Sequence, residues 1–135
     1  MAESALSKKM KLKPGHRAAI VNAPAGYLKE LKPLPTGATV GEKLSGYFDW
    51  IQIFMENKAE LERTLPKTIS CLKPESILWI SFPKGTSKIQ TDLTRDKGWE
   101  SLKKVDMKWI TLISVNETWS AFSMRPYRPG EKKQK

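Results

Sequence analysis

The stretch that decides the fold is residues 48–82, which read FDWIQIFMENKAELERTLPKTISCLKPESILWISF. Its two ends, 48–55 and 76–82, are short, mostly apolar and rich in aromatic and β-branched side chains, as is typical of strands buried on both faces of a sheet. The apolar residues between them recur at helical spacing and predict one apolar helix face: Leu61, Leu65, Ile69 and Leu72. A strand, a helix and a second strand predict two parallel strands joined by a right-handed crossover.

Two residues give the limits of the central helix. Asn57, followed three residues later by Glu60, has the capping-box spacing and predicts the helix start. Pro66 interrupts the apolar pattern, and proline is best tolerated in the first turn of a helix. We therefore expect Pro66 to open a second, short helix.

The rest of the chain extends the alternation of strands and helices. Strands are predicted at 18–22 and 38–42, and helices at 26–32 and 91–104. Residues 107–115 and 118–125 predict two further strands, and the short link between them permits only an antiparallel pair. The order predicts an α/β fold, a three-layer Rossmann-like sandwich with a mainly parallel sheet and a C-terminal antiparallel strand.

Length and composition indicate one globular domain. The 135 residues are 39% apolar and 28% charged, and no apolar stretch is long enough to cross a membrane as a helix. The start of the chain does not have the pattern of a secretory signal, and the single cysteine, Cys71, has no partner for an internal disulfide. We therefore expect a protein of the reducing cytoplasm.

The net charge of +10 is concentrated at the two ends of the chain. Residues 1–17 carry five basic side chains against one acidic, and residues 125–135 carry the same balance, so each end has a net charge of +4. These positions predict a basic N-terminal tail at 1–12, a single folded domain at 13–125 and a basic C-terminal tail at 126–135. Such tails either bind polyanions such as nucleic acids or act as solvated ends.

The candidate site lies where ligands bind in open α/β sheets, at the carboxyl ends of the strands. The turn 22–26, Glu56 with Asn57, and the loop 83–88 come together at that edge. The loop combines two cations, two hydroxyls and a glycine, which suits a phosphate or a carboxylate, although a solvated polar loop has the same composition. The candidate ligand-binding residues are Asn22, Gly26, Lys84, Gly85, Thr86, Ser87 and Lys88.

The residues that usually carry catalysis or bind metals occur singly. His16 has no neighbouring ligand at zinc spacing, and Cys71 lies on the apolar helix as a small hydrophobic residue. No nucleophile elbow or metalloprotease helix is present. Four of the five tryptophans fall on predicted strands and predict core packing, with Trp119 as the candidate exception at a strand edge: Trp50, Trp79, Trp109 and Trp119. We therefore expect no catalytic residue, no metal and no cofactor.

Several of these segments resemble a known fold. Phe48–Ile51, the following helix, Leu72–Ser76 and Ile77–Ile80 resemble the second half of class I S-adenosylmethionine-dependent methyltransferases. Residues 11–125 are also similar to a family of small bacterial proteins of unknown function, a truncated relative of that fold. The similar positions include Lys13-Pro14-Gly15, Asn22-Ala23-Pro24, Leu72-Lys73-Pro74 and Pro83-Lys84-Gly85.

The departures from the methyltransferase pattern concern the cofactor site. The resemblance implies a glycine-rich turn after the first strand, but the turn 22–26 has one glycine and one proline. It also implies a carboxylate after the second strand that holds the ribose hydroxyls, a place that only Glu42 can fill. The glycine pair expected at Glu75-Ser76 is absent, and the chain from Gly26 to Phe48 is short for two strand–helix units.

These observations predict a non-catalytic Rossmann-like module that binds an anionic small ligand or a protein partner at the C-terminal edge of the sheet. Two alternatives stay open. One is a degenerate S-adenosylmethionine-dependent methyltransferase, and the other is nucleic-acid binding through the basic termini.

Overall fold

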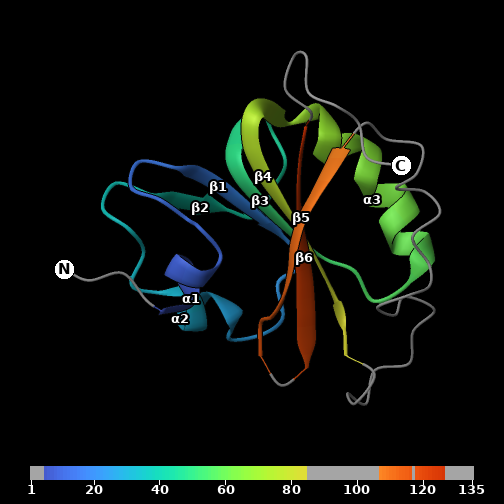
Figure 1. Ribbon diagram of the computed structural model, residues 1–135, viewed down its shortest axis with the longest axis horizontal. Coiled ribbons are helices and arrows are strands. Elements are labelled where there is room, and N and C mark those ends of the chain that lie inside the picture. The colour runs from blue at the N-terminus through green and yellow to red at the C-terminus, as the bar shows by residue number, and fades with distance from the viewer. Residues whose placement is uncertain (1–4, 85–106, 117, 127–135) are drawn as a thin grey trace.

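A six-stranded sheet with strand order β2-β1-β3-β4-β6-β5 forms the centre of the computed structural model (Figure 1). The structure describes residues 5–84, 107–116 and 118–126. The predicted helix at 91–104 and most of the predicted C-terminal tail lie outside the described residues. The elements are α1 (Ala5–Lys9), β1 (Arg17–Val21), α2 (Tyr27–Leu31), β2 (Thr39–Gly41), β3 (Phe48–Phe54), α3 (Lys58–Ser70), β4 (Leu72–Pro83), β5 (Met107–Ser114) and β6 (Trp119–Pro126).

The strand directions are those predicted for a Rossmann-like sandwich. β1 pairs in parallel with both β2 and β3, and β3 pairs in parallel with β4. β6 runs antiparallel to β4 on one side and to β5 on the other. The predicted α/β class, with a mainly parallel sheet and a C-terminal antiparallel strand, is confirmed.

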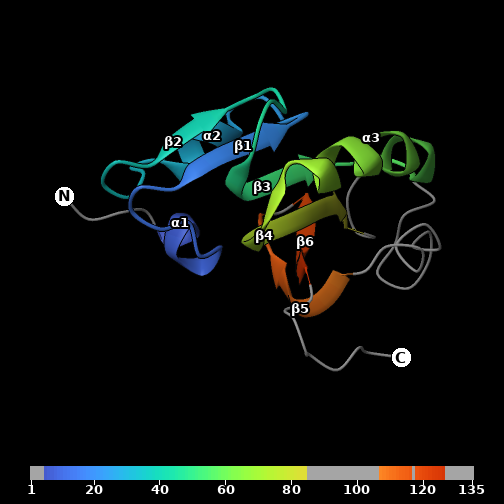
Figure 2. The same ribbon diagram turned by 90° about the horizontal axis from the view of Figure 1, so that it is seen from above.

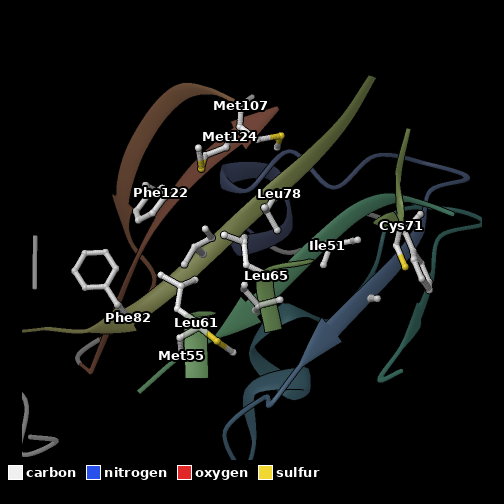
Figure 3. Packing of buried hydrophobic residues seen from close by; sticks show 14 residues of the cluster. Ile51, Met55, Leu61, Leu65, Cys71, Leu78, Phe82, Met107, Phe122 and Met124 are labelled. Atoms are coloured by element: carbon white, nitrogen blue, oxygen red, sulfur yellow. The ribbon is translucent and has the colours of Figure 1, made fainter. Parts of the chain in front are cut away.

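Apolar side chains cover both faces of the sheet. Along each strand, successive side chains point to opposite faces. On β3, Ile51 and Ile53 pack with one cluster of buried residues, whereas Trp50 and Phe54 pack with the other. Helix α3 covers the first face, where Leu61 and Leu65 lie over the sheet near Met55 and Leu78 (Figure 3). The segments α1 and α2 cover the second face, so that α1 and α3 lie on opposite sides of the sheet (Figure 2). The result is the predicted three-layer arrangement.

Helix α3 begins as predicted and continues through its proline. The Asn57 side chain accepts a hydrogen bond from the Glu60 backbone N–H at 2.9 Å, and Glu60 Oε1 accepts the Glu56 N–H at 2.7 Å. The expectation that Pro66 opens a second helix is wrong, because α3 is one helix from Lys58 to Ser70. Pro66 and Glu62, whose carbonyl loses a hydrogen bond to the proline, both lie on the exposed side of α3, where that carbonyl is accessible to solvent.

The predicted N-terminal tail is in large part folded. Residues 5–9 form α1, and Met10 and Leu12 are completely buried. The Met10 carbonyl accepts hydrogen bonds from the indole N–H groups of Trp50 at 2.8 Å and Trp79 at 2.9 Å. Buried indole nitrogens need an acceptor, and the N-terminal segment supplies one for both. The core therefore extends into residues 5–12, beyond the expected boundary at residue 13.

A polar cluster stabilises the edge of the sheet at which the parallel strands begin. Asp49 Oδ2 accepts the Arg17 backbone N–H at 2.8 Å, and Oδ1 forms an ion pair with Lys73. The Arg17 guanidinium donates to the carbonyls of Ser45 at 2.8 Å and of Tyr47. Burial raises the pKa of Asp49, but the Arg17 hydrogen bond and Lys73 outweigh this, so that its pKa lies below the ordinary value. These contacts join the connection before β3 to β1 and β4.

Of the helices that the structure describes, none has both the length and the apolar character needed to cross a membrane.

Truncation of Met10 tests the contribution of the N-terminal segment to the core. We expect Met10→Ala to lower the free energy of unfolding by about 2–5 kcal/mol, because it leaves a cavity where the completely buried Met10 side chain packs in the core. Urea denaturation followed by tryptophan fluorescence measures the change. Lys8→Ala on the exposed side of α1 is the control and is expected to stay within about 0.5 kcal/mol of the wild type. Equal stability of the two variants would contradict the assigned role.

Removal of the Asp49 charge tests the polar cluster. Because the pKa of Asp49 is lower in the folded than in the unfolded chain, its contribution is present above about pH 5 and is lost as the pH falls through the acid range. We expect Asp49→Asn to cost about 1–2 kcal/mol at pH 7 and to lose less stability than the wild type between pH 7 and pH 3. Chemical denaturation at several pH values measures both, with Glu62→Gln as an exposed control. Parallel pH profiles for Asp49→Asn and wild type would argue against this contribution.

Candidate functional site

The sheet has a topological switch point between β1 and β3. From β1 the chain moves to β2 on one side, and β3 then adds to the other side of β1. Both neighbours of β1 are parallel to it, so the three carboxyl ends lie at the same edge. In open α/β sheets this arrangement leaves a crevice at the switch point, and ligands bind there.

The turn from Asn22 to Gly26 leaves β1 at this edge and has a left-handed residue at each end. Asn22 has a φ of 59° and Gly26 a φ of 82°. Asparagine is among the few residues other than glycine that adopt this conformation readily. Both residues are exposed, and a Cβ atom added to Gly26 would meet nothing within 4 Å. The turn therefore has positive φ at both ends and open space beside Gly26, even though it contains one glycine.

A buried hydrogen-bonded chain holds the end of this turn to the sheet. Tyr27, the first residue of α2, donates its hydroxyl to Gln52 Oε1 at 2.6 Å, and Gln52 Nε2 donates to Ser81 Oγ at 2.8 Å. All three side chains are buried, and burial raises the pKa of Tyr27, which keeps its hydroxyl protonated as a donor. This hydrogen-bonded chain joins α2 to β3 and β4 and so holds the turn against the sheet.

One residue in the sequence signals this hydrogen-bonded chain. Gln52 is the one polar residue within the otherwise apolar run 50–55, and a buried amide requires hydrogen-bond partners. Its partners Tyr27 and Ser81 are separated by more than fifty residues, and only the fold brings them to it.

Two acidic residues follow strands at the same edge. Glu42 comes directly after β2, and its side chain is exposed. Glu56 follows β3 and is also exposed, whereas its backbone N–H is used by Glu60 in the start of α3. The predicted strand at 38–42 is present as β2, so Glu42 lies at the end of a strand next to β1.

Lys84 is directed away from the turn at 22–26. Its backbone N–H donates to the Thr118 carbonyl at 2.8 Å, and its Nζ donates to Ser114 Oγ at 2.6 Å. Strand β3 separates β1 from β4, and within the described residues no hydrogen bond or ion pair joins Lys84 to Asn22 or Gly26. The other predicted members of this group lie outside the described residues: Gly85, Thr86, Ser87 and Lys88.

Cys71 and most of the described tryptophans are packed in the core. Cys71 is buried in the apolar cluster beneath α3. Trp50 and Trp79 are completely buried, as predicted. Trp119, expected to be the exception, is also buried and contacts the Phe54 ring edge-on at 5.0 Å, whereas Trp109 on β5 is 43% exposed. The edge position was thus assigned to the wrong tryptophan.

Comparison with known proteins identifies the fold. No protein-family model and no curated protein matches the sequence. Among solved structures, the chain is similar to DhpI in complex with SAH, with 8% identity, a TM-score of 0.62, and coverage of 90% of this chain and 82% of that one. For the ribosomal protein L11 methylase from Lactobacillus delbrueckii subsp. bulgaricus the identity is 13%, the TM-score 0.58, and the coverage 90% and 76%. The Bacillus subtilis M1A22 tRNA methyltransferase TrmK has 11% identity and a TM-score of 0.54, with coverage of 94% of this chain and 67% of that one.

These likenesses confirm one prediction and correct another. The predicted resemblance to the methyltransferase fold is confirmed over most of the chain. The prediction of a non-catalytic module is wrong, because solved structures that share this topology are methyltransferases and the scaffold is therefore an enzyme fold. The chain has the Rossmann-like fold of class I S-adenosylmethionine-dependent methyltransferases.

Removal of the Tyr27 hydroxyl tests how much the buried hydrogen-bonded chain contributes to stability. We expect Tyr27→Phe to lower the free energy of unfolding by about 1–3 kcal/mol, because Gln52 loses its donor inside the core. Tyr47→Phe is the matched control, since Tyr47 is 63% exposed and its loss of a hydroxyl is expected to have no measurable effect. Thermal and urea denaturation measure both variants. An unchanged stability of Tyr27→Phe would show that the hydroxyl contributes nothing.

Proposed function

We propose that the protein binds S-adenosylmethionine at the crevice between β1 and β3 and transfers its methyl group. The observation that carries this proposal is the pair of left-handed residues, Asn22 and Gly26, at the ends of the turn that enters the crevice. The shortage of glycine in this turn argued against a nucleoside cofactor. The positive φ angles remove that objection, because the backbone has the conformation for which glycine is otherwise required. Solved structures with this fold include complexes with SAH and with SAM.

The residues around the crevice fit such a cofactor. The turn is exposed, and the space beside Gly26 is open, so that a ligand can approach the backbone closely. Glu42, exposed at the end of β2, offers the carboxylate that the family resemblance implies for the ribose hydroxyls. The bound cofactor supplies an activated methyl group. The contribution of this chain is to hold cofactor and acceptor in contact and in line, an effect of proximity and orientation rather than of acid–base chemistry.

The other parts of the earlier expectation stay predictions. Lys84 and the loop 85–88 are proposed to contact an anionic part of a ligand at the same edge of the sheet. Nucleic-acid binding through the termini concerns segments that lie largely outside the described residues. A cytoplasmic location likewise stays a prediction from the sequence.

Calorimetric titration with S-adenosylmethionine tests the cofactor site. We expect saturable binding by the wild type and a loss of about tenfold or more in affinity for Glu42→Gln, since a hydrogen bond to a charged group contributes about 1.5–3 kcal/mol. Glu62→Gln on the exposed side of α3 is the charge-matched control, with wild-type affinity expected.

Two variants at Asn22 separate backbone from side chain. Asn22→Gly keeps access to the left-handed conformation and is expected to retain binding, whereas Asn22→Val disfavours it and is expected to weaken binding. The proposal is wrong if the wild type gives no heat of binding at millimolar cofactor.

A further inference from the structure

Two lysines that are distant in the sequence meet on one serine at the carboxyl edge of the sheet. Lys9 Nζ, from the last residue of α1, donates to the Ser114 carbonyl at 2.7 Å. Lys84 Nζ, one residue beyond β4, donates to Ser114 Oγ at 2.6 Å. Ser114 is itself the last residue of β5. Three segments of the chain thus come together around two ammonium groups.

Two positive charges lie at this corner. Over residues 5–84, 107–116 and 118–126, neither Lys9 nor Lys84 forms an ion pair. Among the residues that the structure describes, Glu30 brings a carboxylate near this corner, and this carboxylate accepts a hydrogen bond from Asn116 Nδ2 at 3.5 Å. A lysine ammonium has three donors, and each of these two uses one of them on Ser114. Two cations held to the same residue repel each other, and an anion between them would relieve this repulsion.

Hydrogen bonds fix the backbone segments that carry the two lysines. α1 is fixed by the Met10 carbonyl, which accepts from two tryptophans, and by Ser7 Oγ, which donates to the Leu31 carbonyl at 2.8 Å. The Lys84 backbone N–H donates to the carbonyl of Thr118. Asn116 Oδ1 accepts the N–H groups of Thr118 and Trp119 at 2.9 and 3.0 Å, which orders the turn after Ser114. The two ammonium groups are therefore presented from fixed backbone positions.

This corner faces the same side of the molecule as the crevice. β4 and β5 are both antiparallel to β6, so their carboxyl ends lie at the edge where β1 and β3 also end. With strands about 4.8 Å apart, the corner is about 12 Å along that edge from the switch point. A small acceptor molecule can span this distance between a methyl-accepting group at the crevice and a second group at the lysines.

We propose that Lys9 and Lys84, joined by Ser114, bind the phosphate group of the methyl acceptor. A phosphate monoester carries nearly two negative charges at neutral pH, which matches two ammonium groups, whereas a carboxylate matches one. The inference rests on the proposed function in that it gives the acceptor a chemical class. It also brings into the site a residue, Lys9, from the segment that the sequence assigned to a tail.

Binding of inorganic phosphate tests the site directly. In titrations at low ionic strength and pH 7.5, followed by phosphorus NMR, we expect saturable binding in the millimolar range by the wild type. Lys84→Met is expected to bind about tenfold more weakly, and Lys84→Arg is expected to retain binding. Lys67→Met is the control, because Lys67 is an exposed lysine on α3, which covers the opposite face of the sheet from α1, and wild-type affinity is expected. Acetate, a monoanion, is expected to bind several times more weakly than phosphate.

Equal phosphate affinity of Lys84→Met and wild type, or equal affinity for acetate and phosphate, would overturn the proposal. Lys9→Met, checked for folding by circular dichroism, replaces Lys84→Met if that variant does not fold. Phosphate and S-adenosylmethionine are titrated separately into the wild type. Phosphate binding without cofactor binding leaves the lysine site standing and removes the proposed function, and the reverse result removes the lysine site alone.

Discussion

The structure depends on the burial of both faces of strand β3. Every residue of β3 except Asp49 is buried, and its side chains alternate between the cluster under α3 and the cluster under α1 and α2. A strand in this position needs a hydrogen-bonded neighbour on each side and a helical layer on each face. β1 and β4 provide the neighbours, both in parallel. The switch point lies between β3 and its neighbour β1, because β2 pairs with the other side of β1.

The candidate cofactor site shows that backbone conformation and residue composition are separate properties. The turn 22–26 has fewer glycines than the methyltransferase pattern calls for, and composition alone argued against a nucleoside ligand. Its conformation removes that argument, because Asn22 takes the left-handed region and Gly26 closes the turn in the same region. The buried chain from Tyr27 through Gln52 to Ser81 then fixes where the turn sits.

The N-terminal segment has more than one structural role. Its Met10 carbonyl satisfies two buried indoles, and Lys9 reaches the end of β5. A short basic segment with apolar residues at Leu6, Met10 and Leu12 has the composition of a tail but the contacts of a core element. Its packing links the core of the second face to the edge of the sheet where ligands are proposed to bind.

Local patterns were sufficient for most of the architecture. The apolar runs at β3 and β4, the Asn57 cap and the short link before β6 depend on neighbours in the chain, so the sequence alone determined the strand types, the α/β class and the antiparallel end. Three features depended on contacts between distant segments. α3 continues through Pro66 because packing on the sheet outweighs one lost hydrogen bond. Residues 5–12 join the core because Met10 and Leu12 are buried against it and the Met10 carbonyl accepts from two indoles. Lys9 and Lys84 meet only because α1, β4 and β5 end at one corner, a juxtaposition that no local pattern encodes.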